Sequence, residues 1–176
     1  MNQALSNSFD LLETQRKALL NLIENLSPEQ LHAHPDGKWS IAQIISHLIA
    51  SETLSVRYLN KKIQGIHEAP NTGMVEELKM IVLVISQRLP FIKFKAPGVL
   101  ANNTPVYQSA AELKEVWNKT RLELKEVLAR FEADQLKRKI YKHPIAGMLN
   151  IQQTTRFFRE HIIHHTPQVK NLLRQN

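Results

Sequence analysis

Apolar residues recur three and four positions apart over long stretches of the chain, which is the spacing of amphipathic helices. Glycine is rare, with five residues, and we find no alternating run that would predict a pair of β-strands. The pattern therefore predicts helices at about 4–26, 40–64, 74–88, 109–131 and 150–173. A further short helix is predicted at Ser27-Pro28, because serine caps helices and proline is tolerated at the first helical position.

Polar side chains mark where three of the long helices begin. In each case a capping residue stands three positions before a glutamine or glutamate that can complete a capping box: Ser40 with Gln43, Ser109 with Glu112 and Asn150 with Gln153. Proline, glycine and asparagine predict turns or irregular stretches at 34–37, 65–73, 90–105 and 143–147. The sequence thus predicts an all-α fold, a four-helix bundle with extra short helices. The connection between residues 65 and 109 is too long for a simple hairpin, so we expect a crossover there.

The chain has 176 residues, which suits a single domain spanning residues 1–176. It contains no cysteine, which excludes disulfides, thiolate metal sites and a cysteine nucleophile supplied by this chain. The N-terminus lacks the pattern of a signal peptide, and the longest apolar stretch, near residues 81–85, is too short to span a bilayer. We therefore predict a cytoplasmic protein with no membrane association.

The formal net charge is +7, which would permit binding to nucleic acid, anionic lipid or an acidic ligand. The lysines and arginines are scattered, however, and few aromatic residues lie among them. This distribution is typical of a solvated basic surface. We do not expect a nucleic-acid partner and predict a small-molecule substrate instead.

Three of the eight histidines lie on helix faces that should point into the core. His47 falls on the apolar face of the second long helix, whereas His161 and His165 stand one turn apart on the last one. Three imidazoles can bind a borderline divalent ion and leave coordination positions open, as catalytic sites do. An inward histidine is more often a hydrogen-bonded core residue, so spacing alone leaves a metal site and a structural role equally open.

Two segments resemble the DinB/YfiT-like superfamily. They are PDGKWSIAQIISHLIASE, residues 35–52, and HPIAGMLNIQQTTRFFREHIIHHTPQVKNLL, residues 143–173. The resemblance implies an up-down-down-up four-helix bundle, often dimeric, with a divalent ion, zinc or nickel, bound by His47, His161 and His165. His164, the middle member of the H-x-x-H-H motif, is not an expected ligand. Pro167 follows the ligand pair inside the last helix, where it either bends the helix or is tolerated, and either would alter the metal geometry.

We consider three functions, of which the resemblance implies the first two. The first is transfer to or from a low-molecular-weight thiol such as bacillithiol or mycothiol, with Arg16, Arg57 and Tyr58 as candidate contacts to that cosubstrate. The second is metal-dependent hydrolysis, for which His164 and Glu52 are candidate general bases, although Glu52 lies off the His47 face and would be solvated on a helix surface. The third is a non-catalytic stress protein that binds a metal or small ligand.

Overall fold

The computed structural model describes residues 1–88 and 104–175, so most of the irregular stretch predicted at 90–105 lies outside the described residues. In chain order its elements are α1 (Gln3–Asn21), α2 (Pro28–His32), α3 (Ile41–Lys62), the 3-10 helix η1 (Ile63–Glu68), α4 (Met74–Arg88), α6 (Ala110–Ala129), the 3-10 helix η2 (Ala133–Gln135), β1 (Tyr141–His143), β2 (Gly147–Leu149) and α7 (Ile151–Leu173).

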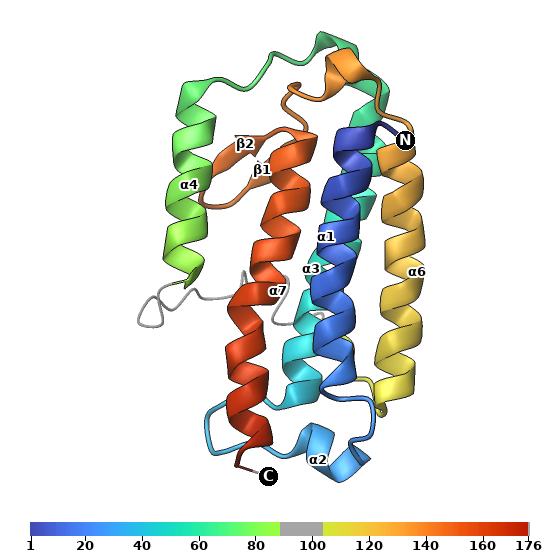
Figure 1. Cartoon of the computed structure of the whole chain (residues 1–176), viewed down its shortest axis with the longest axis vertical. Helices are drawn as coiled ribbons and strands as arrows, with labels where there is room; N and C mark the ends of the chain where they lie inside the picture. The colour runs from blue at the N-terminus through green and yellow to red at the C-terminus, as the bar shows by residue number, and fades with distance from the viewer. Residues whose placement is uncertain (89–103, 176) are drawn as a thin grey trace.

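The four longest helices form the bundle, and their directions give it the expected topology (Figure 1). α1 and α7 run one way, and α3 and α6 run the other way. α1 packs mainly against α7 and α3 mainly against α6, so each closely packed pair is parallel. α4 lies outside the bundle against α7 and carries the chain back, which allows α6 to run parallel to α3. The predicted up-down-down-up bundle with a crossover is confirmed.

Helix starts follow the capping signals closely. Complete capping boxes begin α3 at Ser40 and α7 at Asn150, which places both helices in the register that the sequence predicts. The box at Ser109 is only half formed. Its hydroxyl accepts the backbone N–H of Glu112, but the Glu112 carboxylate accepts from the N–H of Gln108 rather than from that of Ser109.

Two predicted elements differ from the structure. α1 ends at Asn21 rather than near residue 26, because the N–H groups of Leu22 and Ile23 bond three residues back and tighten the last turn. The turn predicted at 143–147 connects an antiparallel hairpin, β1 with β2, which the sequence analysis missed. Strands of three residues are too short to show alternation, and Gly147, at φ +77°, supplies the left-handed conformation that the turn needs.

A buried ionic network joins α1, α3 and α6 beside the apolar core. Arg121 on α6 contacts Glu52 of α3 at 2.8 Å and Glu13 of α1 at 3.2 Å. The indole N–H of Trp117 donates to the second oxygen of Glu52 at 2.8 Å. Arg16 forms a two-pronged ion pair with Glu13, so two arginines share two carboxylates across three helices.

No helix in the described ranges is both long and apolar enough to cross a bilayer, as the sequence predicts. The predicted cytoplasmic location stays a prediction.

Candidate metal centre

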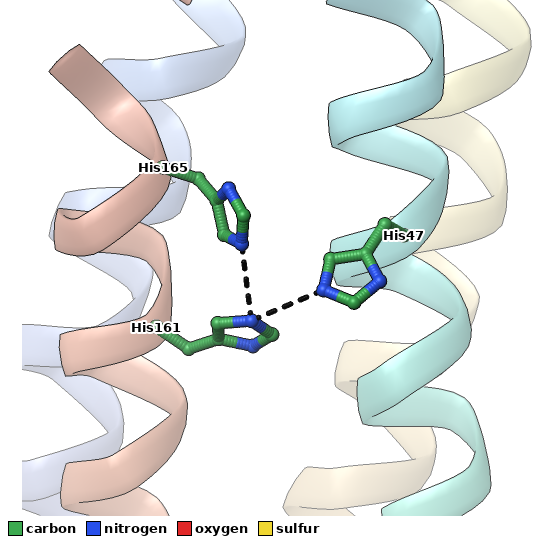
Figure 2. Close-up of side chains that lie close together, drawn as sticks. All are labelled: His47, His161 and His165. Carbon is green, nitrogen blue, oxygen red and sulfur yellow. Dashed lines mark hydrogen bonds between the residues drawn. The ribbon is translucent and has the colours of Figure 1, made fainter. Parts of the chain in front are cut away.

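The structure brings His47, His161 and His165 together between α3 and α7 (Figure 2). His161 Nε2 lies 3.2 Å from His47 Nε2 and 3.2 Å from His165 Nε2. The candidate ligand nitrogens of the three residues all lie within 4.8 Å of one another. His47 and His165 are buried, and His161 is partly exposed. Three imidazoles from two helices thus point their Nε2 atoms at one small volume.

The spacing of these nitrogens fits a single ion. Two nitrogens that each lie about 2.1 Å from one ion, at angles of about 100–110°, are separated by roughly 3.2–3.4 Å. The donor set contains imidazole only, which suits zinc and nickel better than magnesium or calcium. The residues therefore fit a three-histidine site that leaves coordination positions open, and their binding of metal stays a prediction.

Burial keeps the three rings neutral, which is the form that binds metal. Desolvation, together with the neighbouring histidines, lowers the pKa of His47 to about 4 and that of His165 to about 3. The pKa of His161 falls well below its usual value, first because of burial and then because of its histidine neighbours, His165 and His47 above all. Their lone pairs are thus available at neutral pH.

Three neighbouring side chains hold these rings in place. His165 Nδ1 lies 3.1 Å from the Gln168 side-chain oxygen; donation to that acceptor leaves the lone pair on Nε2. The Phe157 ring stacks on His161 at 5.5 Å and an interplanar angle of 15°. Trp39, just before α3, packs its ring 5.1 Å from that of His47. Gln168 stands three residues after His165, so helical spacing places the two side chains side by side. Nothing in the sequence indicates the roles of Phe157 and Trp39.

His164 lies beside the three-histidine cluster, but its Nδ1 is bonded outside that cluster. Its ring lies 4.9 Å from that of His165, and its Nδ1 donates to the backbone carbonyl of Gln87 on α4. The residue therefore ties α7 to α4. Its candidate role as a general base stays a prediction.

Glu52 is not solvated, contrary to the sequence analysis. Its side chain is 1% exposed and is held by Trp117 and Arg121. Apolar spacing predicted that Glu52 would be solvated, because the residue lies off the His47 face. α3 is buried on more than one side, however, since it packs against α6 as well as α7. Both carboxylate oxygens serve the ionic network, and the candidate role of Glu52 as a general base stays a prediction.

The candidate contacts for a thiol cosubstrate lie in different places. Arg16 is buried as predicted, but its guanidinium is taken up by Glu13 and by the Asn118 side chain. Arg57 and Tyr58 lie ten and eleven residues beyond His47 on α3, or about 15 Å along the helix axis. Their contact with a cosubstrate stays a prediction that the geometry does not favour.

Pro167 is tolerated without a break in α7, which continues to Leu173. Proline at this position removes the bond to the carbonyl of residue 163. The N–H groups of His161 and His165 bond to carbonyls nearer the start of the helix, so the proline removes the backbone hydrogen bond of neither residue.

His143, at the start of the stretch predicted as a turn, is the last residue of β1, and its side chain is buried. Its Nδ1 accepts the backbone N–H groups of Ile145 and Ala146, and its ring packs 4.4 Å from that of Phe157. Burial lowers its pKa to about 4. His143 therefore shapes the hairpin and supports the ring that stacks on His161.

Comparison with known proteins identifies the family. A solved structure of YfiT from Bacillus subtilis, described as "a probable metal-dependent hydrolase with an unusual four-helix bundle topology", superimposes with a TM-score of 0.57 at 19% identity, covering 99% of this chain and 89% of that one. At that identity the likeness shows the fold alone. No curated protein matches the chain. The family model for the DinB superfamily matches residues 11–169, which is most of the chain, and the protein therefore belongs to the DinB superfamily.

Proposed function

We propose that this protein is a metal-dependent enzyme in which His47, His161 and His165 hold one divalent ion, and that it transfers a group to or from a low-molecular-weight thiol. The observation that carries the proposal is the convergence of three neutral imidazoles, with Nε2 atoms 3.2 Å apart from His161 to each partner. Zinc or nickel fits this donor set. When bound, such an ion supplies Lewis acidity, which lowers the pKa of a water or thiol in an open position.

The chain's own residues prepare the site in three ways. Burial keeps the ligand rings unprotonated, so the ion meets no competing proton at neutral pH. Gln168 fixes the tautomer of His165, and Phe157 fixes the plane of His161. Trp39 packs its ring against that of His47.

Thiol transfer is favoured over hydrolysis by the state of the nearby carboxylates. Hydrolysis is aided by a general base within reach of the metal-bound water. Glu52, on the helix of His47, is held by Arg121 and Trp117, and Glu160, next to His161, is held by Arg88 and Arg159. A thiol depends less on such a base, because its free pKa of about 8.5 lies far below the value of about 15.7 for water before a metal ion lowers either. Since the chain has no cysteine, the thiol must come from a cosubstrate.

The test measures turnover and metal content together. The protein is loaded with zinc or nickel and assayed with bacillithiol, mycothiol or glutathione and a chromogenic aryl halide. We expect one ion per chain and turnover that needs both metal and thiol. His161→Ala should lose the ion and the activity while it stays folded, whereas His34→Ala, at an exposed histidine, should keep both. A wild type that holds no stoichiometric ion under any loading condition would refute the site.

Hydrolysis is the second candidate, with His164, whose ring lies 4.9 Å from that of His165, as the proposed general base. Turnover of esters or amides without added thiol, lost in His164→Ala but with metal retained, would favour it over transfer. Metal binding without turnover of either kind would instead support a non-catalytic binding protein.

A further inference from the structure

A cavity of about 320 Å³, which we call the α7 cavity, lies on the outer side of α7. α7 packs between α1 and α4 (Figure 1), and side chains of all three helices line the cavity. Ser8 comes from α1, Glu77 from α4, and Gln152, Arg156 and Arg159 from the first half of α7. At about 30 Å³ for each water molecule, the cavity has room for roughly ten of them, which is enough for a small metabolite.

The α7 cavity is separate from the candidate metal centre. An α-helix turns by about 100° per residue, so Arg156 and Arg159 are rotated by about 140° and about 160° from His161. His161 points toward α3, and none of the three clustered histidines lines the cavity. A ligand bound there does not reach the ion, so the site has a role distinct from the proposed chemistry.

The residues that line the cavity, within the described part of the chain, are all polar or charged. Most ligand pockets are instead largely apolar, with a few polar groups that fix the orientation of the ligand. A wholly polar cavity holds water unless an excess of charge in it favours an ion of the opposite sign. The charges along the α7 cavity therefore decide what it can bind.

Two guanidinium groups supply positive charge that is only partly neutralised. Arg156 is exposed and forms no hydrogen bond or ion pair with a described residue. Arg159 donates to one oxygen of Glu160 at 2.8 Å, but Arg88 donates to the other at 2.8 Å, so one carboxylate serves two cations. The Nε–H of Arg159 is buried and has no acceptor among the described residues. Both arginines of the cavity, three residues apart on one helix face, therefore keep donors for a ligand.

Among the described residues, Glu77 is the one carboxylate that lines the cavity, and it belongs to α4. One of its oxygens accepts the side-chain N–H of Gln153 at 2.8 Å. Two guanidinium groups against one carboxylate leave the lining with a net positive charge. Gln152, four residues before Arg156, adds an uncharged amide that can donate to the same ligand. The lining therefore favours an anion with several acceptor oxygens.

We propose that the α7 cavity binds a small metabolite through a carboxylate or phosphate group, which Arg156 and Arg159 hold together. The planar fork of a guanidinium group matches two oxygens of either group, and such charge-assisted hydrogen bonds are about twice as strong as neutral ones. The ligand carries roughly a dozen non-hydrogen atoms at most, since the cavity holds about ten water volumes. An acidic ligand also agrees with the formal net charge of +7.

The test is isothermal titration calorimetry with inorganic phosphate and with succinate, at constant ionic strength. The protein is titrated metal-loaded and again after treatment with phenanthroline, a neutral chelator, because an anion bound to the ion itself is lost with the metal. We expect saturable binding of at least one probe that persists after metal removal, with a Kd on the order of 1 mM. Binding of phosphate alone would assign a phosphate-bearing ligand, binding of succinate alone a carboxylate-bearing one, and binding of both a site that accepts either group.

Three variants locate the bound anion. Arg156→Gln should weaken binding about tenfold or more, because a charge-assisted contact is lost. Arg174→Gln is the matched control and should leave the affinity unchanged. It removes an exposed arginine from the same face of α7, about 27 Å further along the helix axis. Glu77→Gln should tighten binding about two- to fivefold, because a like charge leaves the lining.

Circular dichroism confirms that each variant is folded. Because Glu77→Gln is expected to gain affinity and Arg156→Gln to lose it, misfolding of one variant leaves the other as a test. Absence of saturable binding of both probes to the metal-free protein would overturn the proposal. So would an Arg156→Gln variant that binds as wild type does, an equal loss of affinity in Arg174→Gln, or weaker binding by folded Glu77→Gln.

Discussion

Replacement of Glu52 by Gln separates a structural role from a catalytic one. In the structure Glu52 is buried between α3 and α6, where one oxygen contacts Arg121 at 2.8 Å and the other accepts the Trp117 indole N–H at 2.8 Å. Glutamine has nearly the same shape and can still accept from Trp117. The change therefore removes one negative charge beside a guanidinium that is 3% exposed.

The stability lost in Glu52→Gln depends on which groups still neutralise Arg121. Removal of one partner from a buried ion pair costs about 3–5 kcal/mol, because the other charge stays buried. Glu13 still contacts Arg121 at 3.2 Å, and the bond to Trp117 survives, so we place the loss near the lower limit, about 3 kcal/mol. For a domain of this size that corresponds to a fall in Tm of roughly 9 °C.

The assay is urea unfolding followed by far-UV circular dichroism, in the presence of a chelator. Glu126→Gln, at an exposed position on α6, is the control and should stay within about 0.5 kcal/mol of wild type. Metal affinity and thiol transfer by folded Glu52→Gln should match those of wild type. Unchanged stability would show that our account of the buried network is wrong. Unchanged stability with lost turnover would make Glu52 a catalytic residue.

Two further predictions concern the histidine cluster. Gln168→Ala should weaken metal binding about 10- to 100-fold in competition with a chromogenic chelator, because His165 loses its orienting partner, whereas the exposed Lys170→Ala should have no effect. The metal-free protein should lose stability as pH falls from 7 to 5, because His47 and His143, with folded-state pKa values of about 4, stay neutral while the unfolded chain takes up protons near pH 6.5. Each contributes about 2 kcal/mol of loss at pH 5. Urea unfolding curves that coincide at the two pH values would contradict this.

Local signals carried most of the helix assignment. Capping pairs at Ser40 and Asn150 predicted the starts of α3 and α7 because a cap is a contact between residues three apart. The predicted end of α1, near residue 26, is wrong because apolar spacing continues through the tight turn after Asn21. The hairpin was missed because three-residue strands show no period and gain their stability from α3 and α4 beside them.

For the candidate site, too, local spacing predicted some features and the packing of separate elements decided the others. The sequence by itself determined that His161 and His165 share a helix face, since residues four apart on a helix are neighbours whatever the fold. It also placed His47 on an apolar face, and a family resemblance supplied the pairing with α7. The roles of Trp39 and Phe157 lay beyond it, because they depend on how separate elements meet.

What only the tertiary structure decided is which apolar or charged side chains find partners. Glu52 is buried because α6 brings Arg121 and Trp117 to it, a contact across 65 or more residues that no local pattern contains. The exposed face of α4, with Leu78, Ile81 and Ile85, has the same helical spacing as a core face, yet it points outward because the packing of α4 on α7 uses the other side. Periodicity shows that a helix face is apolar, and the packing of the whole chain decides what covers that face.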